Sequence, residues 1–166
     1  MTSTGDFSEF YLATWPRLYR TACAVAGDAA AAEDALQSAY ARAYASWRRV
    51  RNADHPEAYV RRIVLNEIIS TRRRAFWRRE RTTDAPPDRG QPPVEAEVAE
   101  HDRVWRAVLD LPVRQRAVIV LRYYEDLSET EIAAVLGCSR GTVKSQASAA
   151  LANLRRHADL TTEDLT

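Results

Sequence analysis

Apolar residues recur at every third or fourth position through most of this chain, which is the spacing of an amphipathic α-helix. The clearest stripe lies in a helix predicted over residues 28–50, with Asp28 as its N-cap. Its apolar positions are Leu36, Tyr40, Ala43 and Trp47. A first helix is predicted over residues 7–26 and ends at Gly27. Glycine occurs only 5 times and alanine is abundant, so the pattern predicts an all-α fold with little or no sheet.

The opposite face of the helix over residues 28–50 is polar but carries little charge. Its residues are Asp34, Gln37, Ser38 and Ala41. A face of this kind suits contact with a protein partner, and an ordinary solvated surface is the alternative.

Residues 52–56 (Asn-Ala-Asp-His-Pro) interrupt the helical pattern, and Pro56 suits the start of a further helix over residues 57–81. The apolar face of that helix carries Val60, Val64 and Ile68. Its other face combines arginines with an amide, a hydroxyl and an aromatic ring: Arg62, Asn66, Ser70, Arg73 and Trp77. Arginine binds phosphates, an amide reads base edges, and an aromatic ring stacks on an unpaired base. The helix is therefore predicted to contact nucleic acid.

Residues 127–145 predict two short helices joined by a three-residue turn. Ser128 and Glu131 form a capping box, Gly137 ends the first helix, and Ser139 caps the second. The second helix has one apolar face, with Val143, Ala147, Leu151 and Leu154. The pattern is that of a helix-turn-helix, whose second helix can lie in a DNA major groove. An ordinary αα-hairpin in a helical bundle is the alternative.

Residues 82–93 separate these regions and contain four prolines, one glycine and no large apolar side chain. Such a segment cannot bury enough surface to offset its chain entropy. We therefore predict an N-terminal domain over residues 6–81, a flexible linker over 82–94, a C-terminal domain over 95–157 and an acidic tail over 158–166.

The predicted linker has a simple test. Limited proteolysis with trypsin is expected to cut first at Arg89 and to release two helical fragments, because a segment without a core is open to the protease. Mass spectrometry of the early fragments identifies the site. Protection of Arg89 under native conditions would show that this segment is packed.

The net charge of +1 hides a strong segregation of charge along the chain. Residues 42–81 hold twelve arginines and four acids, a balance of +8. Residues 83–112 hold three arginines and seven acids, a balance of −4. Residues 113–156 hold seven basic and four acidic residues, a balance of +3. Two basic blocks separated by an acidic segment suggest two surfaces for a polyanion.

Several classes of protein do not fit the composition. No apolar run approaches the about 18 residues of a membrane span, and the first ten residues do not resemble a signal peptide. We therefore expect a cytoplasmic protein without membrane insertion. Cys23 and Cys138 lie far apart and only three histidines occur, so no metal site and no cofactor are predicted. Both cysteines are expected to be small buried side chains.

The order of these motifs resembles that of the extracytoplasmic-function (ECF) sigma factors. Residues 32–37 (Ala-Glu-Asp-Ala-Leu-Gln) and 63–66 (Ile-Val-Leu-Asn), followed by clustered arginines, are similar to domain 2 of that family. Residues 110–112, 121–124 and 132–145, which end in Gly-Thr-Val-Lys-Ser, look like its domain 4. The resemblance covers roughly residues 7–157. It implies a dissociable subunit of bacterial RNA polymerase that recognises and melts promoter DNA and performs no covalent chemistry.

The resemblance also implies roles for particular positions. Asp34 and Gln37, with Ser38 and Ala41 on the same face, match the surface that binds the core polymerase. Asn52, Asp54 and His55 match the loop that captures a base flipped from the −10 element. The helix that follows matches the one on the opened −10 strand, through Arg62, Asn66, Ser70, Arg73 and Trp77. The second helix of the helix-turn-helix matches the reader of the −35 element, through Arg140, Gly141, Thr142, Lys144, Ser145 and Ser148.

Two departures from the family pattern affect these expectations. Ser38 stands where the family often has a glutamate, so the polymerase contact is expected to differ in composition. The recognition helix has alanine and serine where many members carry basic residues, and Lys144 is the only lysine of the chain. Phosphate anchoring by this helix is therefore expected to be weak.

Expected partners are bacterial core RNA polymerase and promoter DNA, and the family resemblance adds an anti-sigma factor that the sequence does not identify. Two other classes stay open at this stage. A homodimeric helix-turn-helix regulator would need a dimerising or ligand-sensing domain, and residues 6–81 offer an arginine-rich helix instead. A nuclease or recombinase would need a nucleophile with a base, or clustered acids for metal ions, and no such constellation stands out.

Overall fold

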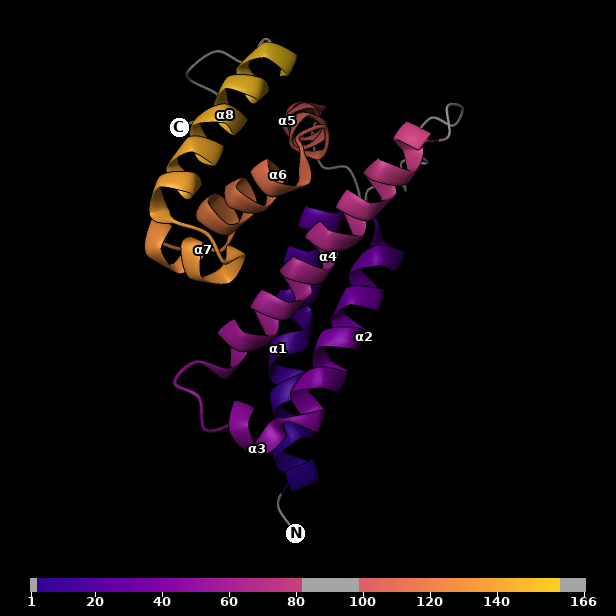
Figure 1. The fold of residues 1–166 in the computed structure, drawn as a ribbon, viewed down its shortest axis with the longest axis vertical. Coiled ribbons are helices and arrows are strands. Elements are labelled where there is room, and N and C mark those ends of the chain that lie inside the picture. Colours follow the sequence, from indigo (N-terminus) through magenta and orange to yellow (C-terminus); the bar gives the residue numbers. More distant parts are fainter. Residues whose placement is uncertain (1–2, 82–98, 159–166) are drawn as a thin grey trace. The chain divides into compact units, whose positions relative to one another are not determined.

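A computed structural model of the chain describes residues 3–81 and 99–158, and all regular structure in these two ranges is helical (Figure 1). The chain divides into two compact units, Met1–Gln91 and Pro92–Thr166, called here the N-terminal and C-terminal units. The all-α prediction is confirmed. The linker predicted over residues 82–94 and the residues after Ala158 lie outside the described ranges. No described helix is long and apolar enough to cross a membrane.

The N-terminal unit consists of α1 (Ser3–Ala26), α2 (Ala29–Ala45), the short α3 (Trp47–Val50) and α4 (Pro56–Arg81). The three long helices pack against one another in every pairing, so they enclose one core (Figure 1). The apolar stripes predicted for α2 and α4 are buried in it. Its largest fully buried side chains are Leu18, Val25, Leu36, Val50, Val60, Val64 and Leu65.

The end of α1 and the start of α2 follow the sequence signals. Gly27 has φ +69°, and its amide donates to the Cys23 carbonyl at 2.8 Å. Asp28 then caps α2, because its carboxylate accepts the amide of Ala30 at 3.1 Å. A left-handed glycine followed by an N-cap aspartate turns the chain within two residues, which is what the sequence predicts.

One helix predicted over residues 28–50 is two helices in the structure. Ser46 leaves the helical region, with φ −113° and ψ 23°, and separates α2 from α3. The turn places Trp47 in the core, where its ring lies 5.2 Å from Phe7 and 5.1 Å from Phe10 by centroid. The prediction of a continuous helix was wrong here because the break depends on packing against α1, which periodicity does not reveal.

Tyr40 occupies the centre of an aromatic cluster formed by α1 and α2. Its ring contacts Tyr11 at 4.8 Å and Trp15 at 5.7 Å between centroids, and its hydroxyl shares a 2.7 Å hydrogen bond with Thr14. Burial raises the pKa of Tyr40 to about 12, although the hydrogen bond to Thr14 opposes this shift.

This raised pKa predicts a loss of stability at alkaline pH. The pKa of Tyr40 in the folded protein lies above its usual value near 10. Burial of the neutral phenol therefore contributes fully to the free energy of unfolding below pH 10, and this contribution is lost as the pH rises toward 12. A shift of this size corresponds to roughly 2–3 kcal/mol. Thermal melting across this range should show a steeper decline for the wild type than for Tyr40→Phe. Parallel declines for the two proteins would contradict the assignment.

The C-terminal unit consists of α5 (Ala99–Leu109), α6 (Val113–Ile119), a short π-helix η1 (Val120–Tyr124), α7 (Glu129–Leu136) and α8 (Arg140–Ala158). Helix α8 packs against α5, α6 and α7 and so organises the unit (Figure 1). One core cluster joins α5 and α8 with the end of α6: Ala107, Val108, Leu111, Ile119, Ala150 and Leu154.

The predicted helix-turn-helix is confirmed in its details. Ser128 accepts the Glu131 amide at 3.2 Å, and the Glu131 carboxylate accepts the Ser128 amide at 2.7 Å, which completes the capping box. Gly137 has φ +64° and ends α7. Ser139 caps α8, since its hydroxyl accepts the Thr142 amide at 3.1 Å. These signals fix where α8 begins and therefore which of its residues face outward.

Candidate nucleic-acid interface

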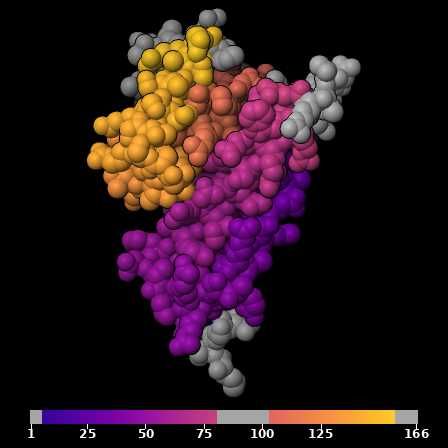
Figure 2. Space-filling view, in the orientation of Figure 1, coloured from indigo at the N-terminus to yellow at the C-terminus, as the bar shows by residue number. Residues whose placement is uncertain are grey.

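Helix α8 presents one polar face to solvent. Val143, Ala147, Ala150 and Leu154 are buried on the inner side. Arg140, Gly141, Lys144, Ser145 and Ser148 are exposed and Thr142 is half-buried. The six residues predicted to read DNA are thus all accessible on one helix, which forms part of the surface in Figure 2.

The hydroxyls at the start of α8 are partly used within the helix. Thr142 Oγ1 shares a 3.0 Å hydrogen bond with Ser139 Oγ, and Ser145 Oγ donates to the Thr142 carbonyl at 3.0 Å. Their remaining lone pairs can accept hydrogen bonds, whereas Arg140 and Lys144 supply charged donors beside them. This part of α8 therefore offers both acceptors and cations to a groove.

A substitution at Gly141 can distinguish a role in folding from a role in DNA binding. Its φ is not positive, and a Cβ built there would meet only Ser139 Oγ at 3.7 Å, an ordinary van der Waals distance. Gly141→Ala should therefore leave the free energy of unfolding unchanged or raise it by at most about 1 kcal/mol. If DNA approaches this backbone closely, the same change should weaken duplex binding several-fold in a fluorescence anisotropy titration. Equal affinity of the two proteins would remove Gly141 from the interface.

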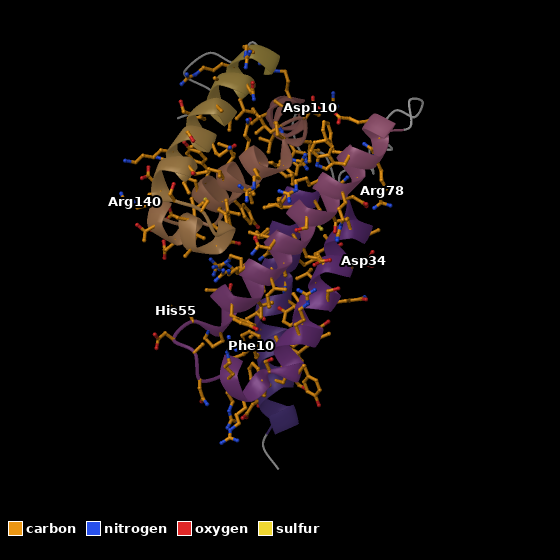
Figure 3. The ribbon with its side chains drawn as sticks, in the orientation of Figure 1. Phe10, Asp34, His55, Arg78, Asp110 and Arg140 are labelled. Atoms are coloured by element: carbon orange, nitrogen blue, oxygen red, sulfur yellow. The ribbon has the colours of Figure 1, made fainter. Side chains whose placement is uncertain are left out.

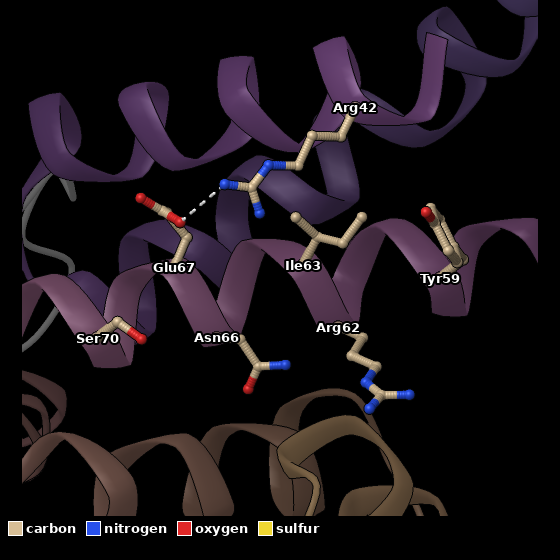
Figure 4. Close-up of a pocket in the computed structure, with 7 residues that line it drawn as sticks. All are labelled: Arg42, Tyr59, Arg62, Ile63, Asn66, Glu67 and Ser70. Carbon is tan, nitrogen blue, oxygen red and sulfur yellow. Dashed lines mark ion pairs between the residues drawn. The ribbon is translucent and has the colours of Figure 1, made fainter. Parts of the chain in front are cut away.

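The outer face of α4 gathers the second set of predicted residues. Arg62, Ser70, Arg73 and Trp77 are exposed, and Asn66 is half-buried. Figure 4 shows Arg62, Asn66 and Ser70 projecting to the same side of α4. They line a shallow groove of about 310 Å³ together with Arg42, Tyr59, Ile63 and Glu67. Arg42 and Glu67 form an ion pair of 3.6 Å between α2 and α4 along this groove (Figure 4).

Two exposed aromatic rings follow at the end of this face. Trp77 and its neighbour Phe76 are each 58% exposed, and their rings lie edge to face with 6.2 Å between the ring centroids. Sequence reasoning identified Trp77 but missed Phe76, although an aromatic pair inside an arginine cluster was the available signal. The pair offers two exposed aromatic rings, nearly perpendicular to each other, among positive charges, and either ring can stack on an unpaired base.

The loop between α3 and α4 carries the third set. Asn52, Asp54 and His55 are all exposed, and Figure 3 shows His55 on this loop. Asn52 donates from Nδ2 to the Arg48 carbonyl at 2.9 Å, so its side chain holds the loop to α3. Arg51, which sequence reasoning missed, pairs with Asp6 of α1 at 3.2 Å. The loop is therefore attached at its beginning, while Asp54 and His55 remain accessible.

The polar face of α2 is exposed as predicted. Asp34, Gln37 and Ala41 are exposed and Ser38 is half-buried. Asp34 and Ser38 also border a groove of about 250 Å³ between α2 and α4, opposite Thr71 and Arg72. Arg72 donates to the carbonyl of Ala26 at the end of α1, which anchors this side of the groove. A partner on α2 would therefore meet a groove lined by both polar and apolar side chains.

Comparison with known proteins decides the family. The model for Sigma-70 region 2 matches residues 10–78, and the model for Sigma-70 region 4 matches residues 101–154. The RNA polymerase sigma-E factor of Streptomyces antibioticus is 36% identical over 96% of this chain and 87% of its own length. The ECF RNA polymerase sigma factor SigL of Mycobacterium tuberculosis is 33% identical over 83% of this chain and 80% of its own. This chain is an ECF sigma factor.

A solved structure supports the fold of this sigma factor. The sigma factor RpoE of Bartonella quintana, determined in complex with the anti-sigma factor NepR, aligns with a TM-score of 0.75 and 24% identity. The alignment covers 93% of this chain and 98% of that one. The α2, α3–α4 and α4 surfaces lie within region 2 of the sigma factor, and α8 lies within region 4.

As a sigma factor, the protein directs transcription initiation and is not an enzyme. Among the residues with described positions, no three His, Cys, Asp or Glu side chains are grouped to hold a metal ion. Cys23 and Cys138 are free thiols. Cys23 is buried as predicted, and burial raises its pKa. Cys138 is only half-buried, because it lies in the turn between α7 and α8, so its predicted burial was wrong.

Proposed function

We propose that this sigma factor divides promoter recognition among three surfaces. The outer face of α2 binds the core polymerase through Asp34, Gln37, Ser38 and Ala41. The face of α4 and the loop before it bind the opened −10 strand. The exposed face of α8 reads the −35 element in the major groove.

The face of α4 carries this proposal. It combines exposed arginines, a half-buried amide and an exposed aromatic pair along one helix, and it belongs to a segment with a charge balance of +8. A duplex-binding surface needs cations and hydrogen-bond donors, whereas two exposed rings add the stacking surface that suits unstacked bases. The combination therefore supports binding to melted DNA by α4 and its loop.

Melting needs no catalytic group under this proposal. A base that leaves the duplex and enters the α3–α4 loop stabilises the open form, because the protein then binds the open strand better than the closed one. Asn52, Asp54 and His55 are the exposed polar side chains of this loop and are the candidates for that contact. We also propose that residues 6–81 and 95–157 are the two functional domains. The protein is proposed to act in the cytoplasm, together with polymerase and chromosome.

Transcription in vitro with the purified chain and bacterial core polymerase tests the proposal, with start sites mapped over genomic DNA. The expected result is initiation at a limited set of sites that share −35 and −10 elements. The alternative, a homodimeric regulator, predicts a dimer in gel filtration and no initiation by core enzyme. A monomer that forms a 1:1 complex with core polymerase favours the sigma role.

An anti-sigma factor is a further proposed partner. A solved sigma factor with this fold, RpoE of Bartonella quintana, was determined with an anti-sigma factor bound. If such a partner acts here, it should block both polymerase binding and DNA binding when it is added to the transcription assay.

A further inference from the structure

Three cations in the C-terminal unit converge on one acid. The Glu129 carboxylate lies 3.8 Å from Arg122 Nη1, 3.6 Å from Arg140 Nη2 and 3.8 Å from Lys144 Nζ. Arg122 comes from η1, whereas Arg140 and Lys144 come from the first turns of α8. Two of these three cations belong to the face proposed to read DNA.

The acid is more sheltered than the cations around it. The Glu129 side chain is 25% exposed, against 40% for Arg122 and about 60% for Arg140 and Lys144. A partly sheltered carboxylate is screened less by salt than a fully exposed one. Its negative potential therefore acts at the outer positions where phosphate oxygens would approach.

Glu129 takes no part in the capping box that begins α7. The capping box is completed by Ser128 and Glu131, whose two hydrogen bonds satisfy the cap. Helix α8 contains no acidic residue from Arg140 to Ala158. The negative charge beside its basic residues thus comes from a side chain of α7 that the cap does not require.

We propose that Glu129 is an internal competitor for DNA phosphate that sets the affinity of α8 for DNA. In the free protein it pairs with Arg122, Arg140 and Lys144, and these cations must leave it to bind a phosphate backbone. Its charge also repels that backbone. The effect keeps binding of the free sigma factor to DNA weak, and it rests on the proposed role of α8 at the −35 element.

The test uses the full-length protein and a labelled random-sequence duplex, titrated by fluorescence anisotropy at several salt concentrations. Glu129→Gln keeps the size of the side chain and removes its charge. Because binding to random DNA is almost wholly electrostatic, Glu129→Gln should bind roughly 3- to 10-fold more tightly and steepen the salt slope by about one. Glu9→Gln, the same charge change on the exposed side of α1, is the matched control and should bind like the wild type.

A second variant guards against a folding effect. Glu129→Asp keeps the acid in the first turn of α7, where it favours the helix dipole, but withdraws the carboxylate from the three cations. It should also bind DNA more tightly than the wild type, with an unchanged melting temperature. Affinity of both variants equal to that of Glu9→Gln would overturn the proposal, and weaker binding would show instead that Glu129 positions the cations for DNA.

Lys144→Ala distinguishes failure of this inference from failure of the proposed function. If Lys144→Ala binds DNA more weakly than the wild type and Glu129→Gln binds it equally well, Glu129 is not a competitor for phosphate, and the DNA-binding role of α8 still stands. Equal binding by Lys144→Ala and the wild type would refute the role of α8 itself. In the Lys144→Ala background, Glu129→Gln should have a smaller effect than in the wild type, because one of the competing cations is gone.

Discussion

The double substitution Asp34→Arg with Gln37→Ala is expected to abolish promoter-directed transcription and co-purification with core polymerase. Both side chains are exposed on α2, opposite the buried stripe that includes Leu36 and Tyr40. Exposed substitutions of this kind usually change the free energy of unfolding by no more than about 0.5 kcal/mol. Loss of hydrogen bonds and a misplaced charge at a buried protein contact cost several kcal/mol, about 2–5 or more. Binding should therefore fail while the fold survives.

A control on the same helix makes this result specific. Glu33→Arg changes the charge by the same amount, at an exposed position one residue earlier that points about 100° away from Asp34. It should retain polymerase binding. Pull-down, transcription and thermal melting of the three proteins give the comparison. Full transcription by the double variant, with an unchanged melting temperature, would place the polymerase contact elsewhere.

A second large effect is expected to separate base reading from phosphate binding. Asn66 is half-buried between Arg62 and Ser70 in the groove on α4, where its amide can both donate to and accept from a base edge. Asn66→Ala should reduce discrimination among −10 sequences by about tenfold or more, the cost of one lost pair of base hydrogen bonds. This discrimination is measured by comparing transcription from promoters that differ by single substitutions in the −10 element.

Lys144→Ala is the contrasting variant. Its side chain is 61% exposed and its Nζ lies 3.8 Å from the Glu129 carboxylate, so once released from that pair it should act mainly as a phosphate contact. Binding to all duplexes should weaken alike, and the salt slope should fall by about one. If Asn66→Ala also lowered transcription from every promoter equally, the assignment of base reading to Asn66 would be wrong.

The helix ends marked by capping residues, and the buried faces, were predictable because their signals are local. Gly27 with Asp28, and Ser128 with Glu131, satisfy backbone groups within four residues of themselves, so the sequence alone specifies the geometry. The apolar stripes of α2, α4 and α8 are equally local, since a 3.6-residue period decides which side chains share a face. The exposure of Asp34 on α2 and of Lys144 on α8 follows from these stripes without further information.

The features that sequence reasoning missed depend on contacts between segments. The break at Ser46 exists because Trp47 packs against Phe7 and Phe10, some forty residues earlier in the chain. The cluster around Glu129 joins η1, α7 and α8, and its members show no common spacing. The ion pair between Asp6 and Arg51 likewise links positions far apart in sequence. Such contacts appear only once the helices are packed.

Transcription by this chain with bacterial core polymerase is the most direct test of the central claim. The account predicts that core enzyme alone initiates at background level and that adding the wild-type protein produces defined start sites with shared upstream elements. The Asp34→Arg, Gln37→Ala variant should return initiation to background. If the wild-type protein fails to bind core polymerase and adds no start site, the proposed mode of action is contradicted.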